Sequence, residues 1–358
     1  MELADFGFSE DLQKYLKEQN LKNYVTGRII AEHKERYHVL TQQGEYEAEI
    51  TGNMRFTARG REDFPTVGDW VALITYDPEF AIIHKILPRT SMITRQAVGQ
   101  PGGVQIIAAN IDFAFVVQSI DHNFNINRLE RYLTICHASG VEPVIVITKT
   151  DLVESSRVQY LVDSIRLRIK DIPVFTISNE NREGYEALEN SIQKAKTYCM
   201  LGSSGVGKST LLNNLAGRTA MKTGTISQVT GKGKHVTSHR ELFILENGGI
   251  MIDNPGMREV GIADTSDGLE TTFDQVVKLA DKCRYSDCTH TNESGCAVLG
   301  ALEAGELDKD SYENYLKMYR ERAHFESTLA ERKKKDKMLG KILKDYHKRD
   351  VKQKNMKK

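Results

Sequence analysis

Residues 202–209 read Gly-Ser-Ser-Gly-Val-Gly-Lys-Ser, the complete G-x-x-x-x-G-K-[ST] pattern of a phosphate-binding loop. An apolar segment typical of a buried strand, Thr197–Leu201, precedes the loop, and residues 210–215 after it have the pattern of a helix. The glycines let successive backbone N–H groups surround phosphates, and the helix N-terminus adds the positive end of its dipole. The stretch therefore predicts a nucleotide site in an α/β domain, with contacts from Gly202, Ser203, Ser204, Gly205, Val206, Gly207, Lys208, Ser209 and Thr210.

Two side chains of this loop carry the chemistry that triphosphates need. Lys208 would bridge the β- and γ-phosphates, and the Ser209 hydroxyl would ligate Mg²⁺. The alternative is an ordinary glycine turn before a helix. The nucleotide site is favoured, because a strand, all four specified motif positions and a helix follow one another in that order.

The segment Thr148-Lys149-Thr150-Asp151 follows the apolar run 144–147, at the strand end where open α/β sheets place their ligand loops. The Asp151 carboxylate can accept from the N1–H and the amino group of guanine, which adenine lacks, while the stem of Lys149 covers the base. The partner segment is Ile177-Ser178-Asn179, and one of its backbone N–H groups could reach guanine O6. The alternative for 148–151 is a polar turn with Asp151 as a helix cap. We expect GTP and GDP as ligands.

A hairpin pattern over residues 241–252 leads directly into Asp253-Asn254-Pro255-Gly256. Asp253 would hold Mg²⁺ through water, and the Gly256 N–H would contact the γ-phosphate. Upstream, the polar, Gly-rich stretch 231–238 is typical of a mobile switch, whose Thr237 would complete the Mg²⁺ shell. The alternative for this stretch is an ordinary flexible loop.

Met257 occupies the position after Gly256 where many GTPases have a glutamine that orients the attacking water. Methionine does not hydrogen-bond water usefully, so we expect slow intrinsic turnover. His235 in the switch is the internal candidate for orienting or deprotonating that water, the alternative being an exposed loop histidine.

The order of these motifs is itself informative. The base-reading segment 148–151 and its partner 177–179 precede the phosphate loop, whereas ordinary GTPases have the phosphate loop first. A parallel sheet can be cut in one connection and rejoined elsewhere, because only the convergence of strand ends matters. The sequence thus predicts a circularly permuted GTPase domain, with the residues beyond Met257 tethered to its second switch.

Three thiols and an imidazole occur within 14 residues, and together they complete a closed tetrahedral shell. A structural zinc ion is therefore predicted, with buried free cysteines and a surface histidine as the alternative. The predicted ligands are Cys283, Cys288, His290 and Cys296.

The rest of the 358-residue chain fits around these motifs. Five short strand patterns between Tyr24 and Leu87 indicate an OB-like β-barrel. We expect a multidomain α/β protein. Residues 1–88 form an OB-like barrel with a short N-terminal helix (9–22), and residues 89–105 form a linker. Residues 106–263 form a circularly permuted P-loop GTPase domain with helices on both sheet faces, followed by a helical zinc-binding domain over 264–330 and a basic tail over 331–358.

Composition narrows the function classes. The 49 Lys and Arg balance the 49 Asp and Glu, but residues 331–358 hold 13 basic and 4 acidic residues, a net +9 that suits RNA phosphates. No run of 18 uncharged apolar residues exists, so we expect no spanning helix and no membrane partner. The acidic N-terminus lacks the order of a secretory signal, which indicates a cytoplasmic protein.

Taken together, these residues resemble the ribosome small-subunit-dependent GTPase A family (RsgA/YjeQ) over about 24–325. The resemblance rests on Gly68-Asp69-Trp70-Val71 and on the T-K-T-D, phosphate-loop, switch, D-x-P-G and cysteine motifs. It implies a cytoplasmic GTPase that binds the 30S ribosomal subunit and its 16S rRNA late in maturation, with hydrolysis stimulated by the subunit. It also implies a role for His235 in hydrolysis; nothing in the sequence suggests an obligate dimer, so we expect a monomer.

Several positions depart from the usual pattern. Thr148 stands where asparagine is usual, and its hydroxyl can replace part of the amide's role; Asn179 replaces a small alanine. Val236 stands where a threonine is usual, so the Mg²⁺ ligand rests on Thr237 alone, and Ser294-Gly295 precede the last cysteine where a proline is frequent. Two other hypotheses remain open at this point. One is a GTP-switched rRNA-binding module with vestigial hydrolysis, which Met257 and Val236 favour. The other is an ATPase of the same loop class, which Asp151 disfavours.

Overall fold

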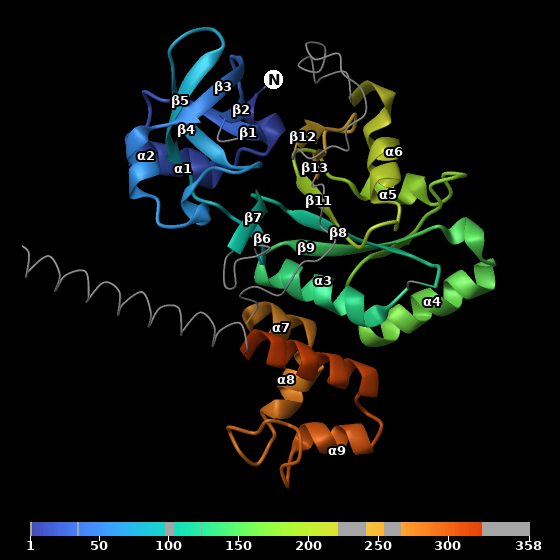
Figure 1. Ribbon diagram of the computed structural model, residues 1–358. Helices are drawn as coiled ribbons and strands as arrows, with labels where there is room; N and C mark the ends of the chain where they lie inside the picture. Colours follow the sequence, from blue (N-terminus) through green and yellow to red (C-terminus); the bar gives the residue numbers. More distant parts are fainter. Residues whose placement is uncertain are drawn as a thin grey trace, which may run out of the picture.

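The computed structural model describes residues 2–33, 36–96, 104–122, 124–220, 241–253 and 266–323. It contains a β-barrel, a mostly parallel sheet flanked by helices, and a group of C-terminal helices (Figure 1). The fold class predicted from the sequence is confirmed. Within the described ranges, no helix combines the length and the apolar character needed to cross a membrane.

Five strands close into the N-terminal barrel: β1 (Val25–His33), β2 (Arg36–Thr41), β3 (Gly44–Ile50), β4 (Trp70–Thr75) and β5 (Phe80–Ile86). Their order is β1-β2-β3-β5-β4, and β4 pairs back with β1. The pairing of β3 with β5 is parallel and the others are antiparallel. Alternate residues of the strands point inward, so Tyr37, Val39, Ala48, Leu73 and Ile83 form the barrel core.

Two short helices accompany the barrel, α1 (Glu10–Glu18) and α2 (Gly52–Thr57). The Ser9 hydroxyl accepts from the Leu12 N–H and caps α1, which ends earlier than the predicted range 9–22. Its Leu12 packs with Phe6, Trp70 and Leu87 outside the barrel core.

The Gly68-Asp69-Trp70 segment joins the barrel to the rest of the chain. Gly68 has φ +93°, and a Cβ there would lie 2.1 Å from the Ala109 carbonyl oxygen, so only glycine fits this approach. The buried Asp69 carboxylate accepts two hydrogen bonds from the Arg89 guanidinium, at 2.8 and 2.7 Å. The segment therefore has a structural role at this junction.

The predicted linker 89–105 contains more secondary structure than expected. Strand β6 (Met92–Gln96) pairs antiparallel with β7 (Val104–Ala109) in a separate two-stranded sheet. Its apolar residues Ile93 and Ile107 enter the core of the neighbouring α/β domain. A five-residue strand gives too short a pattern for recognition from sequence.

The α/β domain has the sheet order β10-β9-β8-β11-β13-β12. Strands β8 (Phe113–Ser119), β9 (Glu142–Thr148), β10 (Val174–Thr176), β11 (Thr197–Leu201) and β13 (Ile250–Asp253) are parallel, and β12 (Glu241–Ile244) is antiparallel to β13. Helices α3 (Ile126–Ala138) and α4 (Ser155–Arg168) cover one face, while α5 (Tyr185–Ser191) and α6 (Lys208–Ala220) cover the other (Figure 1). The ladder continues from β12 into β1 of the barrel through the pair Ala31–Glu241.

Helices α7 (Ser266–Thr272), α8 (Asp274–Ala280) and α9 (Ala297–Glu303), with helical residues 309–323, form the C-terminal unit. Helix α7 lies against α3, where a Cβ on Gly268 would be 2.2 Å from the Thr134 carbonyl oxygen. A glycine at this crossing lets the two backbones approach closely.

A buried carboxylate of the α/β domain also binds the C-terminal unit. Glu130 of α3 and Arg168 of α4 pair at 2.8 Å. Asn314 Nδ2 and the Ser311 hydroxyl, both from the C-terminal unit, donate to the same Glu130 carboxylate at 2.7 and 3.2 Å. Burial raises the pKa of Glu130, and the Arg168 charge opposes that shift.

Arg28 of β1 is a buried cation at the contact between the barrel and the α/β domain. Its guanidinium donates to the carbonyl oxygens of Phe6, Gly68 and Asn110 and to the Thr197 hydroxyl, and it lies 5.5 Å from the centre of the Trp70 ring. Burial lowers the pKa of Arg28 to about 10, so it stays charged at neutral pH. One side chain thus bonds the N-terminal turn, the barrel and two strand ends of the α/β domain.

We expect Arg28→Met to lower the free energy of unfolding by at least about 3 kcal/mol, because three buried acceptors are left without this donor and each costs about 1–3 kcal/mol. Urea unfolding followed by the fluorescence of Trp70, the single tryptophan, measures the change at the contact itself. Arg36→Met is the matched control, because Arg36 makes exposed ion pairs on the same barrel. Equal midpoints for the two variants would contradict the role given to Arg28.

Candidate nucleotide-binding site and metal cluster

The phosphate loop lies between the end of β11 and the start of α6, as the sequence predicts. Gly202, Gly205 and Gly207 have φ of +152°, +79° and +92°. A Cβ on Gly202 would lie 2.3 Å from the Val117 carbonyl oxygen of β8, which excludes any larger residue. Lys208 Nζ donates to the carbonyl oxygens of Gly202 and Ser203, both at 2.6 Å, so its side chain lies along the loop.

A tyrosine that the sequence did not single out lies near the phosphate loop. Tyr132 of α3 is buried, and burial raises its pKa, while the neighbouring Ser203 side chain opposes that shift. Nothing in the local sequence of a regular helix marks one inward-facing tyrosine as a neighbour of a loop 71 positions later.

The T-K-T-D segment turns sharply at the end of β9. Lys149 has φ +60°, and its Nζ lies 3.0 Å from Asp121 Oδ2. Asp121 follows the end of β8 and accepts a 2.9 Å hydrogen bond from the Ser119 hydroxyl. The lysine of the base-reading segment is therefore held by a carboxylate that no sequence motif marks.

The side chain of Asp151 is oriented by Ser178, whose hydroxyl donates to Asp151 Oδ1 at 2.5 Å. The same hydroxyl oxygen accepts from the N–H groups of Glu180 and Asn181 at 3.2 and 3.3 Å. Because these two bonds occupy its lone pairs, its proton is directed at Asp151. The base-reading segment and its predicted partner are thus in direct contact.

The backbone of residues 177–179 is more constrained than the sequence suggests. The Ile177 N–H donates to the Ile147 carbonyl oxygen at 2.8 Å, and the Ser178 N–H donates to that of Glu183 at 3.1 Å. Of the backbone hydrogen bonds in the described part of the chain, none uses the Asn179 N–H. A backbone contact to guanine O6 from this loop therefore points to Asn179, while Ser178 acts through its side chain.

The base-reading and phosphate loops meet directly. The Thr148 hydroxyl donates to the Val206 carbonyl oxygen at 2.6 Å, across 58 positions of sequence. Asn179 Nδ2 donates to the Gly207 carbonyl oxygen at 3.2 Å. Strands β9, β8 and β11 are neighbours in the parallel sheet, so their carboxyl ends converge at this edge. One ligand with a base and phosphates can span both loops.

Asp253 ends β13, the parallel neighbour of β11. Its carboxylate is half-buried, and burial raises its pKa, with the charge of Glu241 adding to the shift. A nearby cation would oppose this shift. The switch 231–238 with His235 and Thr237, as well as Gly256 and Met257, lie outside the described residues.

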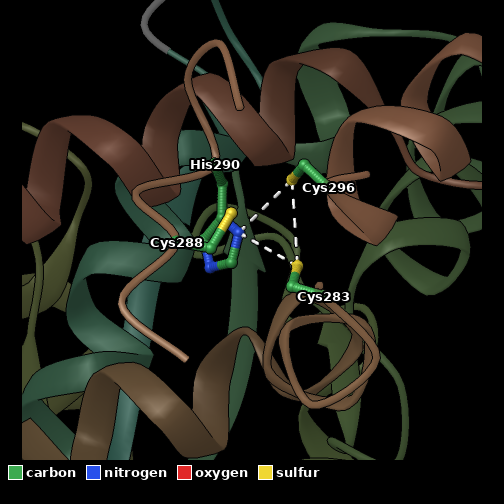
Figure 2. A group of neighbouring side chains, drawn as sticks. All are labelled: Cys283, Cys288, His290 and Cys296. Atoms are coloured by element: carbon green, nitrogen blue, oxygen red, sulfur yellow. Dashed lines mark hydrogen bonds between the residues drawn. The ribbon is translucent and has the colours of Figure 1, made fainter. Parts of the chain in front are cut away.

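The four predicted metal ligands gather between α8 and α9 (Figure 2), with all ligand atoms within 4.8 Å of one another. The Cys283–Cys296 sulfur distance is 3.8 Å, and His290 Nδ1 lies 3.6 and 3.5 Å from these two sulfurs. A tetrahedron with Zn–S bonds of about 2.3 Å has edges of about 3.8 Å. The donor set and its spacing fit a zinc ion that joins α8, the loop and α9.

Bonds around the cluster fix the ligands in place. The N–H groups of Ala297 and Leu299 lie 3.4 Å from the sulfurs of Cys283 and Cys296, a contact that stabilises thiolates. Tyr312 donates to the His290 carbonyl oxygen at 2.6 Å, and His290 itself has φ +59°. The cluster is thus tied to the last helix as well.

Comparison with known protein families gives a match to the RsgA GTPase profile over residues 86–263. An ABC transporter profile also matches residues 185–357, a range that includes the phosphate loop but not Asp151. The phosphate loop is a motif that several nucleotide-binding families share. The second match therefore agrees with nucleotide binding.

Several curated proteins are similar over most of the chain. Small ribosomal subunit biogenesis GTPase RsgA 1 of Bacteroides thetaiotaomicron is 39% identical, with 97% of each chain covered. RsgA 2 of Listeria monocytogenes is 42% identical, with 90% of each covered. Among solved structures, YjeQ from Thermotoga maritima is 25% identical with a TM-score of 0.62, covering 84% of this chain and 98% of that one. YloQ, described as a circularly permuted GTPase, is 25% identical with a TM-score of 0.61, covering 84% and 96%.

Proposed function

This chain belongs to the RsgA GTPase family and is a GTP-hydrolysing enzyme, and on that premise we propose that it acts on the 30S ribosomal subunit late in its maturation. Subunit binding would stimulate hydrolysis of GTP. The observation that carries the proposal is the contact between Thr148 and Val206, because it joins a guanine-reading loop to a phosphate loop in permuted order. The names of the relatives supply the ribosomal partner.

In the proposed complex, Asp151 accepts the N1–H and amino group of guanine, with Thr148, Thr150 and Ser178 shaping the loop. Lys149, held by Asp121, covers the base with its stem. Lys208 exchanges its two loop carbonyls for the β- and γ-phosphates. A Mg²⁺ ion would be held by Ser209, Thr237 and Asp253, and it neutralises phosphate charge when bound. The Gly256 N–H would contact the γ-phosphate.

For hydrolysis, we assign His235 the task of orienting or deprotonating the attacking water. Met257 stands where a glutamine would do this in many GTPases. Intrinsic turnover is accordingly slow, and subunit binding brings the switch into place.

The remaining parts of the chain would serve binding to the subunit. A structural zinc ion on Cys283, Cys288, His290 and Cys296 stabilises the C-terminal unit. The tail 331–358, with its net charge of +9, and one face of the barrel would contact 16S rRNA. We propose that the protein is a cytoplasmic monomer. Its barrel, linker, GTPase domain, zinc-binding domain and basic tail would meet at residues 88, 105, 263 and 330.

The test is GTP hydrolysis with and without purified 30S subunits. We expect stimulation of at least tenfold by the subunit, and its loss in His235→Ala with GDP affinity unchanged, because the histidine acts on water and not on the nucleotide. His33→Ala is the matched control, because it removes an exposed histidine at the end of β1 in the barrel. This variant should keep the stimulation. Equal rates with and without subunits would instead favour a GTP-switched rRNA-binding module.

A further inference from the structure

Thr148 alone is a weak link between the base-reading and phosphate loops. Its hydroxyl lies 2.6 Å from the Val206 carbonyl oxygen and 3.3 Å from that of Gln118. A hydroxyl has a single proton, so it cannot donate fully to both oxygens. An amide side chain would bring two donors to the same place, and this loop lacks one at position 148.

Asn179 supplies a second link from the neighbouring loop. Its Nδ2 donates to the Gly207 carbonyl oxygen, one residue after the carbonyl that Thr148 binds. A Cβ on Gly207 would lie 2.5 Å from this nitrogen, so the glycine leaves the room that the amide occupies. Thr148 and Asn179, both of which depart from the general GTPase pattern, therefore bind consecutive carbonyls of the phosphate loop.

The Asn179 amide is held in a closed ring of hydrogen bonds. The Tyr185 hydroxyl of α5 donates to Asn179 Oδ1 at 2.6 Å, and Asn214 Nδ2 of α6 donates to the Tyr185 oxygen at 2.9 Å. The same Asn214 nitrogen lies 3.3 Å from the Asn179 carbonyl oxygen. Because Gly207 directly precedes α6 and Asn214 lies within it, the Asn179 amide is joined to the phosphate-loop helix at its start and at its third turn. The orientation of the amide, with nitrogen toward Gly207, follows from the Tyr185 donor.

We propose that Asn179 is a positioning residue for guanine nucleotides, which clasps the base-reading side of the site onto the phosphate loop and shares this task with Thr148. The inference rests on the proposed function. Its physical basis is that a ligand spanning two loops binds more tightly when their spacing is fixed in advance. The Asn179 side chain then contributes to affinity for ligands that span the loops, while the choice of base stays with Asp151 and with the Asn179 backbone N–H.

Asn179→Asp is the sharpest test, since it keeps the shape and the acceptor for Tyr185 but places an oxygen opposite the Gly207 carbonyl. We expect GDP to dissociate roughly tenfold faster, with the preference for guanine over adenine and xanthine nucleotides unchanged. Fluorescent GDP release and competition by unlabelled nucleotides measure both. Asn181→Asp is the matched control, with the same change of charge in the same loop, at an exposed residue whose Oδ1 keeps its acceptor role toward the Glu183 N–H.

Three further measurements make each outcome decisive. Tyr185→Phe, which keeps the ring under Arg182, should speed GDP release about threefold and secures the test if the aspartate variant does not fold. Inorganic pyrophosphate, which contacts the phosphate loop alone, should inhibit Asn179→Asp and the unmodified protein equally. Equal GDP release from the two aspartate variants, or a changed base preference, would overturn the inference. An unmodified protein that binds ADP as well as GDP would instead contradict the proposed function.

Discussion

The Asp151→Asn variant will prefer xanthosine to guanosine nucleotides. The Ser178 hydroxyl donates to Asp151 Oδ1 and will keep an oxygen at that position, so the new amide nitrogen will face the base. Xanthine has a carbonyl where guanine has its amino group and can accept from that nitrogen. The bond to the guanine amino group is replaced by two donors that face each other, and the bond to N1–H loses its charge; at about 1.5–3 kcal/mol for each change, we expect a loss in GDP affinity of roughly 10²- to 10⁴-fold.

Competition of GDP, xanthosine diphosphate and ADP against a fluorescent nucleotide measures this exchange. Asp163→Asn, the same substitution at an exposed position of α4, should leave every affinity unchanged. If Asp151→Asn bound GDP and ADP as the unmodified protein does, Asp151 would not read the base. The phosphate loop would then still be a nucleotide-binding site, but the residue that selects the base would have to lie elsewhere.

Removal of zinc will unfold the C-terminal unit. Closed four-ligand sites contribute about 10–16 kcal/mol of apparent free energy in small zinc peptides, and such units commonly fold only with the metal. Here Cys283, Cys288 and Cys296 pack directly with Phe273 and Val298 in a small core of their own, so the metal and the core are lost together. We expect Cys296→Ser, or chelation of the unmodified protein, to abolish the bound zinc and reduce helical circular dichroism.

Metal analysis measures the bound zinc, and thermal melting followed by circular dichroism measures the loss of helix. Cys136→Ala removes a buried thiol from α3, remote from the cluster, and should retain one zinc ion per chain. A Cys296→Ser variant with a full zinc content, or unchanged helicity after chelation, would contradict a structural zinc site.

The sequence is sufficient for those parts of the fold that depend on local patterns. The bounds Thr197–Leu201 of the strand before the phosphate loop are the observed ones, because a strand buried on both faces is a continuous apolar run that ends at a glycine. The four cysteine and histidine ligands meet as predicted, since their spacing allows one closed shell. These features depend on residues close together in the chain.

The missed features all depend on contacts between distant segments. Asp121 is a polar residue after a strand, and only the fold shows that it pairs with Lys149. The sequence left open which backbone N–H of residues 177–179 is available, and the fold shows that the turn to Glu183 uses the Ser178 N–H and leaves the hydroxyl for Asp151. Asn179 was noted as a departure from the family, and its partner on Gly207 lies 28 positions later. Side-chain bonds of this kind have no sequence period.

The buried pair of Glu130 and Arg168 limits how this enzyme can be dissected. Shortening the chain before residue 266 would strip away Ser311 and Asn314, which donate to the Glu130 carboxylate, and would expose the close crossing at Thr134. Studying catalysis on an isolated nucleotide domain would therefore mean studying a surface that the intact protein never presents to water. Fragments for crystallisation or kinetics should keep everything through residue 323.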